Sequence, residues 1–259
     1  MHRNLIKARL KRGEIIFGTM IQEMRTPAIG QLLRQSGFDF FMLDMESGAY
    51  DLETALGILQ VGRFADMCPL VRVISPEYHL IARILDQGAM GIMAPRIESR
   101  AEVCRLVEAA KYPPLGKRGF ASNGPHLEYE LVKLPEVLQA ANEDTLVIAQ
   151  IELQAAVEQI DDLLSVPGVD VALIGPKDLS ISLGVPGETN HPSVVAAIER
   201  VIAAGNRHGV VTGIHVDSIE GLRAWMNKGM RMIMYGSDVS FLANASRAGL
   251  QQLRANTSS

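Results

Sequence analysis

The sequence is poor in aromatic residues and cysteine, and both shortages exclude classes of protein. Aromatic residues make up 5% of the 259 positions, whereas 47% are hydrophobic. The interior must therefore be built from aliphatic side chains, as in layered α/β proteins. The two cysteines, Cys68 and Cys104, are too few for a disulfide framework or a cysteine-based zinc site. We expect both to be small core residues of a cytoplasmic protein.

Basic clusters and long apolar runs are also missing. The formal net charge is −4 at pH 7, and lysines and arginines are scattered among acidic residues, which argues against a nucleic-acid partner. No apolar stretch approaches the roughly 20 residues that cross a membrane. The basic N-terminus is not followed by the apolar segment of a secretory signal. We therefore expect a globular protein that binds neither nucleic acid nor membranes.

What the chain does contain is an alternation of short apolar runs with amphipathic segments. The eight runs are Ile15–Met20, Phe38–Asp44, Leu70–Val73, Gly91–Ala94, Leu146–Ile151, Val171–Ile174, Val211–His215 and Met232–Tyr235. Runs of this length suit parallel strands covered on both faces. They predict a single α/β domain over residues 1–259, a closed (β/α)8 TIM barrel. The rival fold, an open doubly wound sheet, usually has a glycine-rich phosphate loop after its first strand, and this chain has none there.

Helix boundaries can be predicted between the runs. Helices are expected to start at Thr26, at Asp51, at Ser75–Glu77 and at Ser99, which are typical residues for that position. Later helices are expected over 154–165, 193–208, 218–228 and 238–255. The longest irregular stretch covers 112–135, and a loop of that length in a compact domain usually serves as a lid or an oligomer contact.

In such a barrel the active site forms at the carboxyl ends of the strands. The polar residues predicted there are Asp44, Glu46, Ser47, Arg72, Gln150, Glu152, Lys177, Asp178, His215, Tyr235, Ser237 and Asp238. Glu152 and Asp178 follow neighbouring strands, and two hard oxygen ligands with open positions suit Mg²⁺ or Mn²⁺ and can accept Co²⁺. The alternative is that both acids only stabilise the helices that they precede.

Arg72 lies inside an apolar run, where an arginine without a partner is rarely found. Its guanidinium either grips a carboxylate or a developing enolate oxygen, or it forms a buried ion pair with Asp44 or Glu46, and both can hold at once. His215 is either a hydrogen-bonded structural residue or a base. Lys177 is the lysine that a Schiff-base aldolase would use, but its predicted place in a turn argues against that chemistry.

With these residues in place, the sequence resembles the HpcH/HpaI family of class II pyruvate aldolases over nearly its whole length. The motifs that carry the resemblance are Gly37–Asp39, Leu43–Glu46, Val71–Val73, Leu85–Ala89, Tyr112–Gly119, Gln150–Glu152 and Gly175–Ser180. The resemblance implies a phosphoenolpyruvate/pyruvate-domain-like barrel. It also implies a metal-dependent lyase that cleaves a 4-hydroxy-2-oxo acid to pyruvate and an aldehyde. A homo-oligomer is implied as well, a hexamer arranged as a trimer of dimers with an exchanged C-terminal helix.

The resemblance also implies roles for individual residues. The metal ligands would be Glu152 and Asp178, and backbone amides of 175–178 would hold the substrate carboxylate. The predicted catalytic residues are Asp44, Ser47, Arg72 and Asp86. The predicted substrate-binding residues are Arg72, Gln150, Lys177 and Asp178, together with Arg118, which would reach an acidic tail of the substrate from the long loop.

The chain departs from the family pattern at Ser47. Typical members have a histidine there, which acts with an aspartate matching Asp86 as the proton-shuttling base. A serine hydroxyl barely ionises near neutrality and cannot fill that role unaided. Lys177 is a second departure, because the family usually has a small or uncharged residue at that position.

Three outcomes of the serine at position 47 remain open. Aldolase activity is kept if a water on the metal, His215 or His126 serves as the base. Alternatively, the chemistry has moved to enolate formation alone, such as oxaloacetate decarboxylation; macrophomate synthase is a relative of that kind. In the third outcome the protein binds a metal and an oxo acid without turnover. If the base has been lost, Asp86 has no catalytic partner and can be purely structural.

Overall fold

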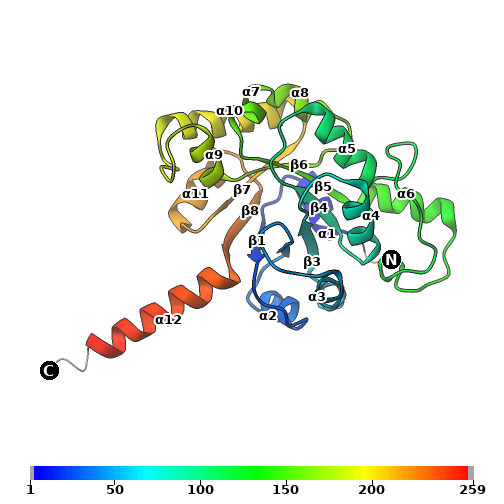
Figure 1. The fold of residues 1–259 in the computed structure, drawn as a ribbon, viewed down its shortest axis with the longest axis horizontal. Helices are drawn as coiled ribbons and strands as arrows, with labels where there is room; N and C mark the ends of the chain where they lie inside the picture. Colours follow the sequence, from blue (N-terminus) through cyan, green and yellow to red (C-terminus); the bar gives the residue numbers. More distant parts are fainter. Residues whose placement is uncertain (1–2, 256–259) are drawn as a thin grey trace.

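The computed structural model describes residues 3–255 and shows a closed barrel of parallel strands (Figure 1). The strands pair in chain order, and the last one closes on the first. They are β1 (Ile16–Ile21), β2 (Phe40–Asp44), β3 (Cys68–Arg72), β4 (Gly91–Ala94), β5 (Leu146–Ile151), β6 (Val171–Ile174), β7 (Val211–Val216) and β8 (Met232–Ser237). The predicted (β/α)8 barrel is confirmed, and each predicted run overlaps one strand. The two ends of the predicted domain range, residues 1–2 and 256–259, lie outside the described residues.

Helices connect the strands and surround the barrel (Figure 1). They are α1 (Leu5–Lys11), α2 (Ile29–Gln35), α3 (Leu52–Phe64), α4 (Tyr78–Asp86), α5 (Arg100–Ala110), α6 (Leu134–Asp144), α7 (Gln154–Glu158), α8 (Ile160–Leu164), α9 (Pro176–Ser182), α10 (Pro192–His208), α11 (Ile219–Asn227) and α12 (Asp238–Ala255), with a short 3₁₀ turn η1 (Pro125–Leu127). Over residues 3–255, no helix combines the length and the apolar character that crossing a bilayer requires.

Side chains alternate along the strands between two separate cores. Phe41 and Leu43 belong to the large cluster between strands and helices, whereas Phe40 and Met42 belong to a smaller cluster inside the barrel. Other strands add to the inner cluster with the same spacing of two: Cys68 and Leu70, Leu146 and Ile148, Val171 and Leu173, Met232 and Met234. The spacing follows from the pleat of a β-strand. On each strand, the residue two positions after the second member of such a pair is therefore expected to face the barrel mouth.

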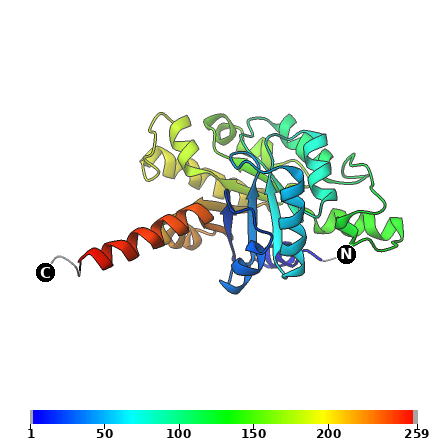
Figure 2. The same cartoon turned by 60° about the horizontal axis from the view of Figure 1, so that its bottom comes forward.

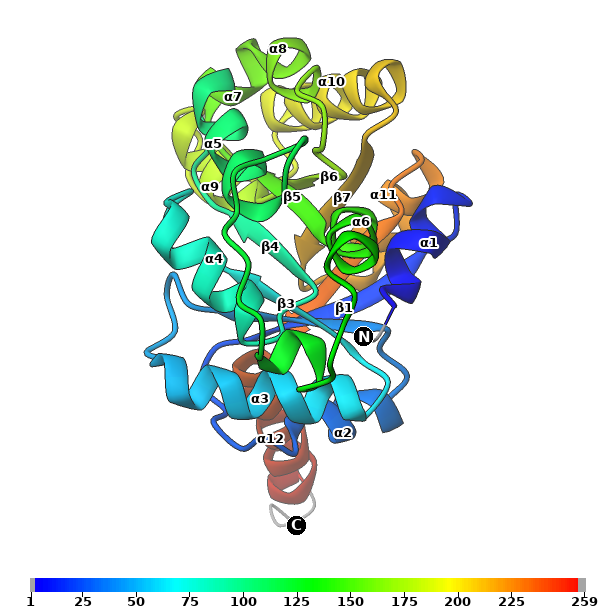
Figure 3. The same cartoon turned by 90° about the vertical axis from the view of Figure 1, so that its right-hand side faces the viewer.

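Helix α1 closes the barrel at the amino ends of the strands. Ile6 and Leu10 belong to the inner cluster. The buried Lys7 Nζ donates to the Thr145 carbonyl and to Asp170 Oδ2, at 2.8 Å each. Figure 3 looks onto this end, with α1 and α6 in front of the strands. A ligand of the barrel interior therefore enters from the opposite end, where the strands finish.

Three of the four predicted helix starts are confirmed, including the one at 75–77, since Glu77 directly precedes α4. Asp51 Oδ1 accepts a hydrogen bond from Thr54 N at 2.8 Å, and Ser99 forms a capping box with Glu102. The prediction at Thr26 was wrong: α2 begins at Ile29, after a turn in which the Thr26 carbonyl accepts the Ile29 N–H. The hydrogen bond at this helix start is accepted by the backbone carbonyl of Thr26. Every residue type has such a carbonyl, so the sequence does not predict this contact.

The other differences concern short helices. The helix predicted over 154–165 is two helices, α7 and α8, that meet at Gln159. The irregular stretch 112–135 contains η1 and runs into α6, which was not predicted, and neither was α1. No side chain of α6 is fully buried, so its apolar residues give only a weak periodic signal.

Candidate active site

Polar side chains occupy the inward positions at the carboxyl ends of five strands. Asp44 follows Met42 and Arg72 follows Leu70, both at the interior spacing of two. The same step leads to Gln150 on β5, to His215 on β7 and to Gln22 just after β1. These residues replace the apolar interior by a polar layer. Above that layer lies a cavity of about 340 Å³ that Gln22, Arg72, Gln150, Asp178 and His215 help to line.

Arg72 is the centre of an ion-pair network at this layer. Its Nε and Nη2 donate to the two carboxylate oxygens of Asp44 at 2.8 and 2.6 Å, and Nη1 lies 2.9 Å from Glu46 Oε2. Asp44 is fully buried. Burial alone would raise the pKa of Asp44, but the bonds from Arg72 outweigh burial and hold it below its usual value. The predicted buried ion pair is present with both acids, and about two of the five guanidinium donors remain for a ligand.

Glu152 follows β5, and its carboxylate is held by a backbone donor and an amide donor. Its Oε1 accepts from the backbone N–H of Arg96 at 2.8 Å, and its Oε2 accepts from Gln150 Nε2. Arg96 has a φ of 52°, a left-handed conformation that is uncommon for a residue with a side chain. Such backbone conformations are concentrated at functional sites. The loop after β4 therefore fixes the orientation of Glu152.

The carboxyl groups of Glu46, Glu152 and Asp178 lie so close together that ionising all three costs free energy. Burial raises the pKa of Glu152 to about 7, and the nearby carboxylates of Asp178 and Glu46 add to the rise. Burial also raises the pKa of Glu46, and Asp44 and Asp178 raise it further against the opposing effect of Arg72. Buried carboxylates that oppose one another are stabilised by a cation.

The donor set around Glu152 fits a hard divalent cation. Oxygen ligands are available from Glu152 and Asp178, and Gln150 Oε1 is buried without a hydrogen-bond partner. No three His, Cys, Asp or Glu side chains within 3–255 are grouped so that they could hold a metal by themselves. A cation held by two carboxylates would thus have several coordination positions left for water or for a ligand, as Mg²⁺ commonly does.

Gly175 makes room for this arrangement. A Cβ at this position would lie 2.8 Å from Glu152 Oε2 and 3.1 Å from Gln150 Nε2. Pro176 starts α9 immediately after it, which places Asp178 in the first turn of that helix. The backbone N–H groups of Lys177 and Asp178 have no acceptor inside α9, because the first turn of a helix provides none. Both residues line the cavity, and such free N–H groups at a helix start suit an anion.

His215 and Lys177 complete this end of the cavity. His215 Nε2 lies 2.9 Å from the Gly236 carbonyl oxygen. Burial lowers the pKa of His215, and the charges of Arg72 and Lys177 lower it further. Lys177 Nζ lies 3.1 Å from Asp217 Oδ2, with 76% of its side chain exposed. An exposed and ion-paired lysine gives no support to Schiff-base chemistry, which requires a desolvated amine.

Two of the predicted site residues lie elsewhere, whereas Ser47 lies at the edge of the ion-pair network. Ser47 is exposed, its Oγ lies 3.5 Å from Arg72 Nη2, and its backbone N–H donates to Asp44 Oδ1 at 3.2 Å. Asp86 is the last residue of α4, which returns to the amino ends of the strands, and its Oδ1 accepts from Arg118 Nη2 at 2.6 Å. Arg118 is buried against the Tyr112 ring, 4.8 Å from its centroid.

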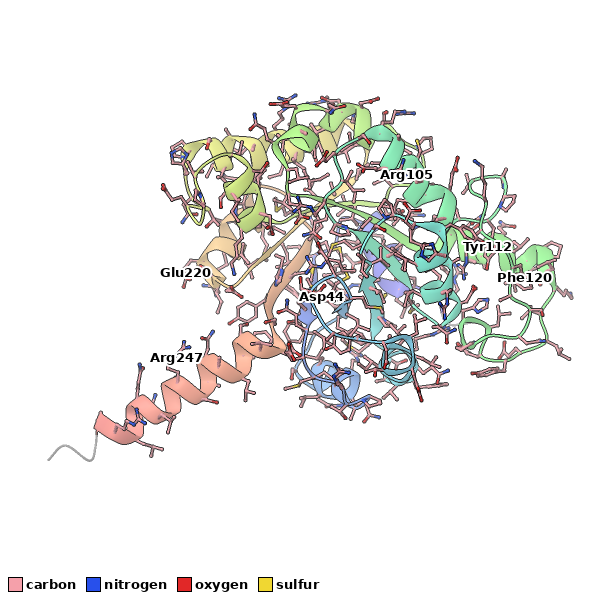
Figure 4. The ribbon with its side chains drawn as sticks, viewed as in Figure 1. Asp44, Arg105, Tyr112, Phe120, Glu220 and Arg247 are labelled. Carbon is pink, nitrogen blue, oxygen red and sulfur yellow. The ribbon has the colours of Figure 1, made fainter. Side chains whose placement is uncertain are left out.

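The prediction that Asp86 and Arg118 belong to the site is therefore not met within one chain. In Figure 4, Asp44 lies at the centre of the barrel, whereas Tyr112 and Phe120 lie at one side near α6. Helix α4 packs antiparallel to the strands, so its last residue is a barrel length away from the strand ends. His126 shares this location, because its Nδ1 lies 3.1 Å from the Asp86 carbonyl oxygen.

Two contributors to the site were missed in the sequence. Gln22 Nε2 donates to Asp44 Oδ2 at 3.1 Å, and the Arg96 backbone binds Glu152. Gln22 could have been found by counting two positions on from Met20. Arg96 could not, because its contribution is a backbone N–H in a left-handed conformation, for which an arginine gives no sequence signal.

Comparison with known proteins agrees with this geometry. A family model described as HpcH/HpaI aldolase/citrate lyase matches residues 23–245. The chain is 32% identical to a hydroxypyruvate/pyruvate aldolase of Paraburkholderia phytofirmans, over 97% of this chain and 98% of that one. It is 30% identical to a 5-keto-4-deoxy-D-glucarate aldolase of Salmonella paratyphi A, over 96% and 95% of the two chains.

Two solved structures are also similar. The crystal structure of an HpcH/HpaI aldolase from Desulfitobacterium hafniense superposes with a TM-score of 0.93 at 33% identity, covering 96% of both chains. Macrophomate synthase gives a TM-score of 0.84 at 25% identity, covering 98% of this chain and 88% of that chain.

Proposed function

Because the chain belongs to the HpcH/HpaI aldolase/citrate lyase family, we propose that it is a class II aldolase, a lyase that depends on a divalent cation. The proposed reaction is the cleavage of a 4-hydroxy-2-oxo acid to pyruvate and an aldehyde. The observation that carries the proposal is the pair of neighbouring carboxylates, Glu152 and Asp178, at the strand ends, where Asp178 and Arg72 line one cavity. Relatives named as aldolases of hydroxypyruvate, pyruvate and a keto-deoxy sugar acid support the reaction class.

Each group at the mouth has a task in this proposal. Glu152 and Asp178 hold Mg²⁺, Mn²⁺ or Co²⁺, which when bound supplies Lewis-acid polarisation of the 2-oxo group. The free donors of Arg72 face the oxygen on which negative charge develops after C–C cleavage. The backbone N–H groups of Lys177 and Asp178 bind the substrate carboxylate. Asp44 and Glu46 keep the guanidinium of Arg72 in place.

The test is to remove metal with EDTA and to measure pyruvate release from 4-hydroxy-2-oxo acids, with and without Mg²⁺, Mn²⁺ or Co²⁺. We expect no release from the stripped protein and full release after addition of metal, because the cation provides the charge stabilisation of the enolate. Stripped protein that cleaves at the full rate would contradict the metal dependence. Ligand-induced stabilisation without product from any substrate would indicate an oxo-acid-binding protein instead.

Oxaloacetate decarboxylation is the second candidate, and Ser47 favours it. Loss of carbon dioxide from oxaloacetate forms the same enolate but needs no base to remove a hydroxyl proton. A chain without a histidine at position 47 could carry out this reaction with the metal and Arg72 alone. The likeness to macrophomate synthase is consistent with it. Decarboxylation without any aldol cleavage in the assay above would select this candidate.

We also propose that the protein is a homo-oligomer, a hexamer arranged as a trimer of dimers, in the cytoplasm. Helix α12 extends away from the barrel instead of packing on it (Figures 1 and 2), and it exposes Leu242, Leu250 and Leu253. An apolar groove of about 650 Å³ beside it is lined by residues of α2 together with Phe38, Tyr235 and Phe241. An exposed apolar helix beside an apolar groove is typical of a protein–protein interface. Both cysteines are free thiols, as is usual in a reducing compartment.

The oligomer can be tested through α12. We expect Leu250→Glu together with Leu253→Glu to convert the oligomer to monomers in size-exclusion chromatography with light scattering, because charges would enter an apolar groove of a neighbouring copy. Gln251→Glu, an exposed change on the same helix, is the control and should leave the mass unchanged. A wild-type protein that is already monomeric at micromolar concentration would contradict the proposal.

A further inference from the structure

We propose that His215 is the base that takes the hydroxyl proton of the 4-hydroxy-2-oxo acid, the role for which Ser47 is unsuited. The inference rests on the proposed aldolase function and adds a catalytic residue to it.

The reaction defines what such a base has to do. It accepts the proton of the C4 hydroxyl while the C3–C4 bond breaks, the aldehyde carbonyl forms and the electron pair of the broken bond passes to the enolate of pyruvate. A proton then returns to C3 to give pyruvate, and the base is regenerated. The atoms balance without an oxidant or a further reactant. A base for this step must be unprotonated, must face the cavity and must have no competing partner.

The acidic side chains at the mouth do not meet these requirements. Asp44 accepts two hydrogen bonds from Arg72, and Glu46 is paired with the same guanidinium. Glu152 and Asp178 are the proposed cation ligands. Asp217 is paired with Lys177 at the exposed rim. Each of these carboxylates is already committed to a cationic partner.

His126, the other histidine considered from the sequence, is in the wrong place. Its ring is buried beside Arg118 and the carbonyl of Asp86, at the amino ends of the strands. A proton acceptor at that end cannot reach a substrate held between Arg72 and Glu152 in the same chain. Position therefore favours His215, which lies on β7 and lines the mouth.

The hydrogen bond of His215 fixes which ring nitrogen is free. A carbonyl oxygen can only accept, so the 2.9 Å contact with Gly236 O requires the proton to be on Nε2. In a neutral imidazole Nδ1 then carries the lone pair. Nδ1 makes no hydrogen bond to any residue that the structure describes, and it is not among the buried atoms without a partner. It is thus an accessible acceptor.

Burial is the main reason why the ring of His215 stays neutral. Burial has the largest effect and lowers its pKa, and Arg72 and Lys177 lower it further. The Gly236 carbonyl and Asp217 act in the opposite direction without reversing the shift. The imidazole is therefore unprotonated near pH 7 and can accept a proton in the first step of cleavage.

The decisive experiment compares two reactions of His215→Gln. Glutamine can retain a donor for the Gly236 carbonyl but has no basic nitrogen. We expect kcat/KM for aldol cleavage to fall by about 10²–10³-fold. Oxaloacetate decarboxylation, which needs no proton removal, should fall far less, so that the ratio of the two activities changes at least about 30-fold. His79→Gln, an exposed histidine outside the cavity, is the matched control.

Two further measurements separate a base from a structural residue. Added imidazole should restore aldol cleavage by His215→Ala, because the small molecule can occupy the space left by the ring. Nitrogen NMR of the wild-type protein should show His215 as the neutral Nε2–H form at pH 7, whether or not a substrate is known. Equal losses in both reactions without rescue by imidazole would mean a structural role.

The outcomes distinguish the two proposals. A wild-type protein that cleaves no 4-hydroxy-2-oxo acid would overturn the proposed aldolase function. A cleaving enzyme in which His215→Gln retains full aldol activity, or in which Nδ1 carries the proton, would overturn the assignment of His215 alone.

Discussion

Glu152→Gln is expected to remove metal-dependent turnover, with a loss of at least about 10³-fold in kcat. Glutamine keeps the size of the side chain and an oxygen that can accept from the Arg96 N–H, but it removes the negative charge that a cation requires. Glu158→Gln, an exposed glutamate of α7, serves as the control. Titration calorimetry with Mn²⁺ checks the cause, since metal affinity should fall together with activity. A variant that turns over normally would remove Glu152 from the metal site.

The same carboxyl makes metal binding depend on pH. The pKa of Glu152 is raised from 4.5 to about 7 in the folded, metal-free protein, so below pH 7 a cation has to displace a proton. We expect the apparent affinity for Mn²⁺ to fall by about tenfold for each pH unit below 7. Between pH 4.5 and 7 the folded state holds more protons than the unfolded chain. The metal-free protein should therefore lose up to about 3 kcal/mol of stability as the pH rises through that window, and Glu152→Gln should abolish this loss.

Arg72→Met is expected to lower both stability and activity. It leaves Asp44, which is fully buried, with Gln22 and backbone N–H groups as its only remaining partners among the described residues. Breaking one partner out of a buried ion pair costs about 3–5 kcal/mol. We expect a destabilisation near the lower limit, measured by urea unfolding, because those neutral donors remain. Activity should fall by about 10²–10³-fold, since the donors that face the developing negative charge are lost.

A double variant separates these two effects. Asp44→Asn with Arg72→Met removes the uncompensated carboxylate, so most of the stability should return while activity stays low. Arg100→Met, which removes an exposed arginine, is the control for the loss of positive charge. If the double variant regained activity together with stability, Arg72 would have only a structural role.

The fold followed closely from the sequence because strands buried on both faces leave a strong pattern. Each of the apolar runs became one strand, and the polar residues in or just after five of them, such as Asp44 and His215, marked the mouth. The spacing of two even extends the prediction from Met42 to Asp44 and from Leu70 to Arg72. The strands and their inward-facing residues could therefore be predicted from the order of apolar and polar residue types.

The remaining parts could not be predicted for physical reasons. Asp86 looked like a catalytic residue, but position along a helix determines which end of the barrel it reaches, and the end of α4 lies opposite the mouth. Arg118 was expected in a substrate-facing loop, yet its ion pair with Asp86 and its stacking on Tyr112 bury it elsewhere. Contacts between segments that are distant in sequence determined both outcomes.

The polar layer at the mouth is divided between two halves of the barrel. Strands β2 and β3 supply Asp44 and Arg72, whereas β5 and β6 lead to Glu152 and Asp178. Each half carries its own hydrogen bonds, and within residues 3–255 no hydrogen bond joins Arg72 to Glu152. The halves still act on each other through charge, because Glu46 raises and Arg72 lowers the pKa of Glu152. A mutation that changes how the anionic product is held therefore also changes the affinity of the other half for a cation, without touching any of its hydrogen bonds.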